Sequence, residues 1–180
     1  MPLLPRTIRL DPSDSIVFER AAEPGEWAVP GGFAFWDESP EAMPGKRRQA
    51  FRAGFLGLSS FGWSTLVEVA EATSAEREAA VASLAAHLVA AYGAPDEAAA
   101  RPAAEEEVAF AESLCEGHPP GTVLALSRSL EEGRVRERFR TLHRRETPHH
   151  DFGRLPVFGI VQVAGEEEPV ERPDLTRLPR

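Results

Sequence analysis

A capped amphipathic helix over residues 74–92 constrains the fold of this chain more than any other feature. Thr73 and Glu76 have the spacing of a capping box, in which each side chain satisfies a free backbone N–H group of the first turn. Gly93 follows where a left-handed residue ends a helix, and Pro95 blocks its continuation. One face of the helix is apolar, through Val81, Leu84, Ala85, Leu88 and Tyr92. We therefore expect a helix that buries this face against another layer.

Strand patterns and turn residues flank this helix on both sides. They predict strands at 7–10, 15–19, 27–29, 33–36 and 63–69 before the helix, and at 122–127, 134–141 and 157–163 after it. Further helices are expected at 40–56 and from Pro102 to about Cys115. Strands mostly neighbour strands, and the helices cluster. We therefore expect an α+β fold, with a single antiparallel or mixed sheet of about six to seven strands and three helices packed mainly on one face.

Length and composition are those of one globular domain. The 180 residues include 42% hydrophobic and 27% charged residues, so residues 1–164 are expected to form a single α+β domain. Residues 165–180 have the composition of a Pro-rich, charged C-terminal arm. The net charge of −9 argues against a nucleic-acid binder, and no run approaches the ~20 apolar residues of a membrane span. With a single cysteine and no signal-peptide pattern, we expect a cytoplasmic protein.

The chain carries no local signature of catalysis or of cofactor binding. It has no G-x-G-x-x-G after a strand, no Walker loop, no G-x-S-x-G elbow and no H-E-x-x-H motif. We therefore predict no catalytic residue and no cofactor, and we favour a protein that is not an enzyme.

The most unusual pattern is an arginine stripe in the strand at 134–141. It consists of Arg134, Arg136, Arg138 and Arg140, which alternate and so leave one face of the strand. Neighbouring like charges repel and need acidic partners. We favour pairing with the chain's own glutamates, because arginine is abundant in this sequence and Lys46 is its only lysine. The alternative is a site for an anion or an acidic partner protein, to which Lys46, Arg47, Arg48 and Arg52 would contribute.

A weaker pattern is the C-x-x-H step formed by Cys115 and His118. Thiolate and imidazole groups can bind a transition metal such as zinc, and further candidates are His143, His149, His150 and Asp151. Structural zinc sites usually present paired C-x-x-C steps, whereas this chain has one cysteine. Cys115 also falls on the apolar face of its helix, where a free cysteine packs as a small hydrophobe, and we favour that interpretation.

Aromatic residues concentrate between positions 27 and 63. Most of them are expected to form the core between the sheet and its first helix. Strand alternation directs Phe33 and Phe35 inward and Trp36 outward. Trp27 and Trp36 are therefore the residues to consider for a protein interface.

Four segments carry a family resemblance: residues 6–14 (RTIRLDPSD), 18–29 (FERAAEPGEWAV), 54–57 (GFLG) and 60–63 (SFGW). They resemble an uncharacterised proteobacterial protein family, a domain of unknown function, and the likeness extends along most of the chain. Members of that family are encoded near biotin/lipoate ligase-like proteins and accessory genes of molybdenum-type formate dehydrogenases. The resemblance implies an accessory role around a metalloenzyme and brings no site residues with it.

These features lead to two functional hypotheses. The first is a non-enzymatic accessory or interaction protein that binds another protein through the aromatic edge or the arginine stripe. The second is a small-molecule or anion-binding protein, even an enzyme, that uses the stripe. A homodimer through edge strands is compatible with either hypothesis.

Overall fold

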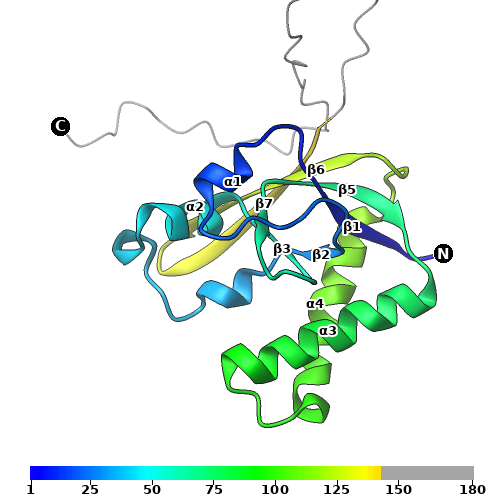
Figure 1. Ribbon diagram of the computed structural model, residues 1–180. Coiled ribbons are helices and arrows are strands. Elements are labelled where there is room, and N and C mark those ends of the chain that lie inside the picture. The colour runs from blue at the N-terminus through cyan, green and yellow to red at the C-terminus, as the bar shows by residue number, and fades with distance from the viewer. Residues whose placement is uncertain (143–180) are drawn as a thin grey trace, which may run out of the picture.

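Two antiparallel sheets and four α-helices form the part of the chain that the computed structural model describes, residues 1–142 (Figure 1). The larger sheet has the order β1-β5-β6-β7 and contains β1 (Leu3–Ile8), β5 (Leu66–Glu71), β6 (Val123–Glu131) and β7 (Arg134–Leu142). The smaller sheet has the order β2-β3-β4 and contains β2 (Ala28–Val29), β3 (Phe55–Gly57) and β4 (Trp63–Ser64). The α+β class is confirmed, but the single sheet of six to seven strands is wrong, and residues 1–142 contain four α-helices rather than three. The predicted strand 157–163 and the C-terminal arm 165–180 lie outside the described residues.

The division into two sheets occurs at Thr65, where one predicted strand becomes β4 and β5. The buried carboxylate of Asp14 accepts hydrogen bonds from the backbone N–H and the hydroxyl of Thr65, at 3.1 and 2.6 Å. The hydroxyl of Ser64 donates to the carbonyls of Ile8 and Leu66. These side chains satisfy backbone groups where the chain leaves one sheet and enters the other.

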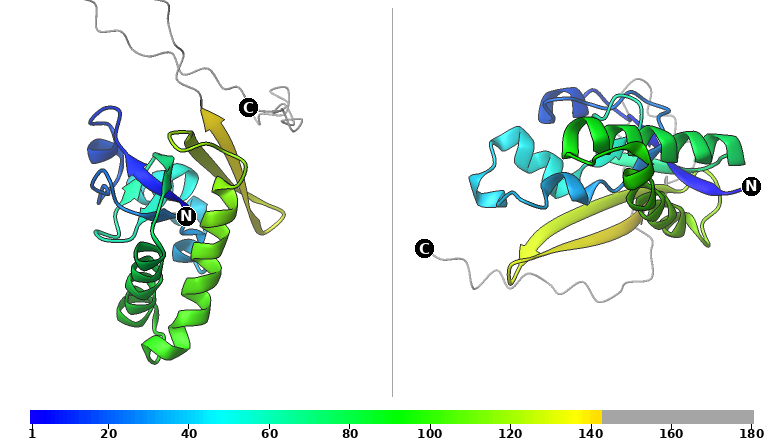
Figure 2. Two further views of the ribbon diagram at one scale, coloured as in Figure 1. Left: turned by 90° about the vertical axis from the view of Figure 1, so that its right-hand side faces the viewer. Right: turned by 90° about the horizontal axis from the view of Figure 1, so that it is seen from below.

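Two long helices, α3 (Ser74–Tyr92) and α4 (Glu97–Cys115), lie side by side (Figure 2). α3 has the predicted bounds and capping box, and Gly93 follows it in the left-handed conformation. α4 begins before the predicted start at Pro102, because the side chain of Asp96 caps it by accepting a hydrogen bond from Ala99 N–H at 2.7 Å. Arg77 of α3 forms ion pairs with two glutamates of α4, Glu105 and Glu112.

The short elements before β3 differ from the prediction. The predicted strands 15–19 and 33–36 are instead the helix α1 (Asp14–Val17) and the 3-10 turn η1 (Gly32–Phe35). The predicted helix 40–56 divides into the 3-10 turn η2 (Pro40–Ala42) and α2 (Gly45–Ala53), and β3 follows. Apolar runs of four or five residues do not distinguish a strand from a short helix, which explains these errors.

Two apolar clusters form the core. One lies between the larger sheet and α4 and includes Phe55, Val67, Leu124, Leu126 and Cys115. The other lies among the helices and the smaller sheet and includes Phe35, Phe51, Trp63, Leu84 and Val108. α3 and α4 lie on one side of the β6–β7 hairpin, and no described helix covers its other side (Figure 2). None of the helices within residues 1–142 is long and apolar enough to cross a membrane.

Candidate functional site

The arginine stripe lies on β7, which is an edge strand of the larger sheet within residues 1–142, and its four arginines are exposed. Glu131, at the end of β6, pairs with Arg136 at 2.9 Å and with Arg138 at 3.2 Å. Arg134 and Arg140 form no ion pair with another described residue. Two arginines of the stripe thus share one carboxylate, and two have none within the described part of the chain.

Apolar side chains lie beside the stripe on the same face of the sheet, which we call the open face. The sheet register places Ile8, Leu66, Ala125 and Arg140 in one row across the four strands, and Arg6, Glu68, Val123 and Leu142 in the next. Arg6 and Glu68 form an ion pair at 2.6 Å. The open face therefore combines an apolar middle, half-buried except for the buried Ala125, with a basic margin at β7.

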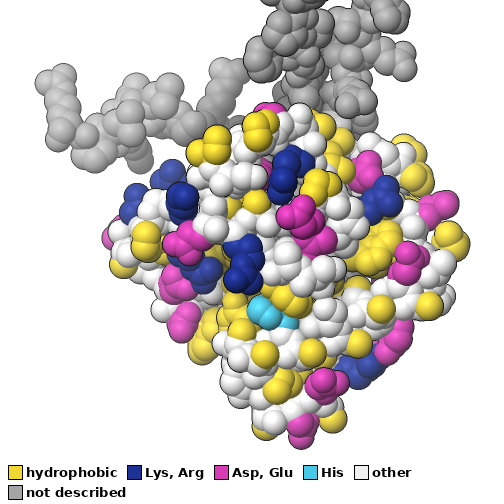
Figure 3. All heavy atoms as spheres, in the orientation of Figure 1, with side chains coloured by type: hydrophobic (Ala, Val, Ile, Leu, Met, Phe, Trp, Pro, Cys, Tyr) yellow, Lys and Arg dark blue, Asp and Glu magenta, His cyan; other side chains and the backbone are white. Residues whose placement is uncertain are grey.

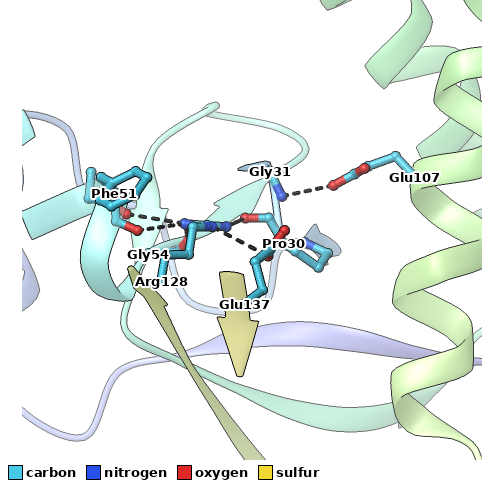
Figure 4. A network of polar contacts seen from close by, with 8 residues as sticks. Pro30, Gly31, Phe51, Gly54, Glu107, Arg128 and Glu137 are labelled. Carbon is cyan, nitrogen blue, oxygen red and sulfur yellow. Dashed lines mark hydrogen bonds and ion pairs between the residues drawn. The ribbon is translucent and has the colours of Figure 1, made fainter. Parts of the chain in front are cut away.

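A buried arginine, Arg128, projects from the opposite face of the same hairpin (Figure 4). Its side chain is 0% exposed, and its Nε pairs at 3.3 Å with the carboxylate of Glu137, which lies across from it on β7. Its Nη1 and Nη2 atoms donate to four backbone carbonyls, those of Pro30, Ala50, Phe51 and Gly54. The guanidinium therefore connects the hairpin to the last turn of α2 and to the turn after β2.

The turn after β2 contains two glycines that allow the contacts of Arg128 and Glu137 to form. Gly31 has a left-handed φ of 74°, and its N–H donates to the carboxylate of Glu107 on α4 at 2.9 Å. A Cβ on Gly32 would lie 2.9 Å from the carboxylate of Glu137. Burial lowers the pKa of Arg128 against the influence of Glu137, and burial raises the pKa of Glu107. With its donors satisfied, Arg128 has the environment of a structural group that positions β7.

Sequence reasoning missed Arg128. The available signal was its position in β6, because it continues the inward alternation of Leu124 and Leu126. The turn that accepts the guanidinium contains Pro30, Gly31 and Gly32, and the carbonyl of Pro30 is the acceptor.

The two candidate interface tryptophans differ in exposure. Trp36 is 78% exposed directly after η1, so it points outward as expected, although from a 3-10 turn rather than from a strand. Trp27 is half-buried, packs against the core and forms an isolated β-bridge with Arg6. Only Trp36 therefore presents a large free aromatic surface among these two.

Cys115 ends α4 fully buried in the cluster beneath the larger sheet, and burial raises the pKa of its thiol to about 12. The backbone N–H of His118 donates to the Cys115 carbonyl at 3.2 Å. Residues 1–142 contain no group of three or more His, Cys, Asp or Glu side chains able to hold a metal ion. The further candidates His143, His149, His150 and Asp151 lie outside the described residues.

A second basic feature is a cleft of about 270 Å³ beside α2. It is lined by Glu19, Arg20, Lys46, Arg47, Ala50, Phe61 and Trp63. Figure 3 shows Lys and Arg side chains, with acidic side chains between them, on the side of the molecule where α2 lies. α2 contacts the face of β6 that carries Arg128, so its basic residues do not extend the arginine stripe.

Comparison with known proteins gives one match. A model of a family of unknown function, DUF6505, matches residues 1–157. No curated protein and no solved structure matches the chain. The match includes all of the described residues and agrees with the resemblance to an uncharacterised family. The chain therefore belongs to the DUF6505 family of unknown function.

Proposed function

We propose that this protein is a non-enzymatic accessory protein that binds an acidic, extended segment of another protein along β7. The arginine stripe carries the proposal, because only two of its four exposed arginines have an ion-pair partner within residues 1–142, and those two share one glutamate. The chain as a whole has a net charge of −9. The net charge therefore opposes the general approach of an acidic segment, whereas the stripe attracts it locally, which favours an approach that brings the segment to β7.

The edge position of β7 allows a partner segment to form main-chain hydrogen bonds with it, in addition to its charge interactions. A strand that pairs with an edge strand gains main-chain hydrogen bonds, and every second side chain of the added strand lies on one face of the sheet. On the open face those side chains would lie beside Arg134 and Arg140, whose charges have no ion-pair partner within the described residues. Carboxylates at alternate positions of the partner segment would satisfy them.

A small anion fits the stripe less well. Arginines at every second position of a strand are about 6.7 Å apart, so four of them define a line rather than a convergent site. A small carboxylate or phosphate is held by donors that converge on it. This geometry favours the extended partner over the alternative of a small-anion site on β7.

The family resemblance suggests which partner to test first. Since it implies an accessory role around a metalloenzyme, we propose a cytoplasmic protein of metalloenzyme maturation as that partner.

The test is co-purification of the tagged full-length chain from its native cells, with a photo-crosslinker in place of Arg140. We expect a stoichiometric partner whose crosslinked peptide is rich in Asp and Glu, and we expect its loss in the double variant Arg134→Glu, Arg140→Glu. The matched control is Arg52→Glu, an exposed position on α2 away from β7. Retention of the partner by the double variant, or crosslinks only to residues 143–180 or to a second copy, would overturn the proposal.

A further inference from the structure

The cleft beside α2 contains two cations that form no ion pair with another described residue. Lys46 is exposed and forms no hydrogen bond or ion pair with another described residue. Arg20 donates a single hydrogen bond, at 3.3 Å, to the carbonyl of Ser60. Arg47, in contrast, is paired with Glu38 at 2.6 Å. Glu19 is the one carboxylate in the lining, so the lining as a whole is basic.

An aromatic side chain in a strained conformation forms part of the same lining. Phe61 has a left-handed φ of 54°, a region that bulky residues rarely adopt and that costs about 1–3 kcal/mol. Its ring stacks on the imidazole of His87, with centroids 3.7 Å apart and planes 5° apart. Trp63 lies in the same lining.

The loop that holds Phe61 is fixed by a buried carboxylate. Glu26 is 7% exposed and accepts hydrogen bonds from the Ser59 N–H, the Ser60 N–H and the Ser60 hydroxyl, at 2.9, 2.6 and 2.8 Å. The Ser60 hydroxyl in turn accepts from Gly62 N–H at 3.0 Å. Strain that the surrounding structure enforces is typical of binding sites, where it positions a group in advance.

We propose that this cleft binds a small organic anion that carries one flat ring. The ring lies against the partly exposed Phe61, beside the largely buried Trp63, and the anionic group lies between Arg20 and Lys46. The volume of about 270 Å³ is below the ~300–1,000 Å³ of sites for drug-sized molecules, which limits the ligand to a single ring with its anionic group. The site uses a different part of the molecule from β7, so it stands independently of partner binding.

Phenyl phosphate is the first probe, followed through the indole N–H signals of the full-length protein by NMR. We expect a saturable shift of the Trp63 signal and no shift of the Trp36 signal, since Trp36 does not line the cleft. Inorganic phosphate lacks the ring and benzyl alcohol lacks the anionic group. Each should therefore bind at least tenfold more weakly than phenyl phosphate. Benzoate distinguishes a preference for a carboxylate from one for a phosphate.

Substitutions in the lining test whether phenyl phosphate binds in the cleft itself. Lys46→Met and Arg20→Met should each weaken the binding of phenyl phosphate at least fivefold, with an unchanged circular dichroism spectrum. Arg52→Met removes an exposed cation from the same helix outside the cleft and should change the affinity less than twofold. The proposal is overturned if neither phenyl phosphate nor benzoate gives a saturable shift at Trp63. It is also overturned if Arg52→Met weakens binding as much as Lys46→Met.

Discussion

Replacing Arg128 by methionine tests whether one buried guanidinium joins the β6–β7 hairpin to the rest of the fold. Methionine keeps an unbranched side chain but has no N–H donor. The substitution leaves four backbone carbonyls and the carboxylate of Glu137 without this donor, at a position where the arginine side chain is 0% exposed. Glu137 is 25% exposed, so water can replace the donor there.

The expected loss of unfolding free energy depends on how many of the acceptors are left without a donor. An unsatisfied buried acceptor costs about 1–3 kcal/mol, and removing one member of a buried ion pair costs about 3–5 kcal/mol. The Ala50 carbonyl keeps a second donor, Gly54 N–H at 2.9 Å, which reduces the sum. We therefore expect Arg128→Met to lower the free energy of unfolding by about 4 kcal/mol. That is a large part of the about 5–15 kcal/mol typical of a folded domain.

Urea unfolding followed by far-UV circular dichroism measures this loss. Glu137→Gln should cost only about 1–2 kcal/mol, because the carboxylate is partly exposed and Arg128 keeps its four carbonyls. Arg134→Met, on the exposed face of the same hairpin, should stay within about 0.5 kcal/mol. The reasoning is refuted if Arg128→Met costs less than about 1.5 kcal/mol, or if Glu137→Gln costs as much as Arg128→Met.

Three further predictions concern single positions. Gly31→Ala should destabilise by about 2–4 kcal/mol in urea unfolding, because φ is 74° and the new Cβ would lie 2.6 Å from the Cβ of Leu56; a neutral effect would contradict this. Cys115 should react with a disulfide reagent only as fast as the protein opens, because it is fully buried and its thiol has a pKa of about 12; rapid native-state labelling would contradict this. Burial, and then the charge of Arg20, lower the pKa of His87 below its ordinary 6.5, so the unfolded chain binds the proton more readily. Stability should therefore fall as the pH falls below 6.5, and Arg20→Met should raise the His87 pKa in an NMR titration, whereas an unchanged value would contradict the assigned cause.

Elements with strong local signals were predictable from the sequence. α3 has its cap, its apolar face and its terminal glycine within one continuous segment, and the structure has the predicted bounds. Both strands of the β6–β7 hairpin were predicted, at 122–127 and 134–141, the second with its alternating arginines. Glu132 and Gly133 adopt left-handed φ values of 51° and 76° there, as a two-residue hairpin turn requires.

Elements whose form depends on distant partners were not predictable. The predicted strand 63–69 is interrupted at Thr65 by bonds to Asp14, which lies fifty-one positions earlier in the chain. The predicted strand 33–36 is a 3-10 turn, and the left-handed Gly31 that precedes it lies beside Leu56 and Trp63. Propensity over a few residues is a weak signal that such tertiary contacts override.

By itself, the sequence determined the capped helix α3, the hairpin, the alternation of the arginine stripe and the apolar setting of Cys115. Only the tertiary structure decided that Arg128 is buried while the arginines of the stripe are exposed, and that Arg20 and Lys46 meet at one cleft. The physical reason is the distance along the sequence over which each effect acts. Backbone geometry places neighbouring side chains on one face or the other within a few residues. Whether a charge can be buried depends on partners that folding brings together, and those of Arg128 in and directly after α2 lie 74 to 78 positions away in the sequence.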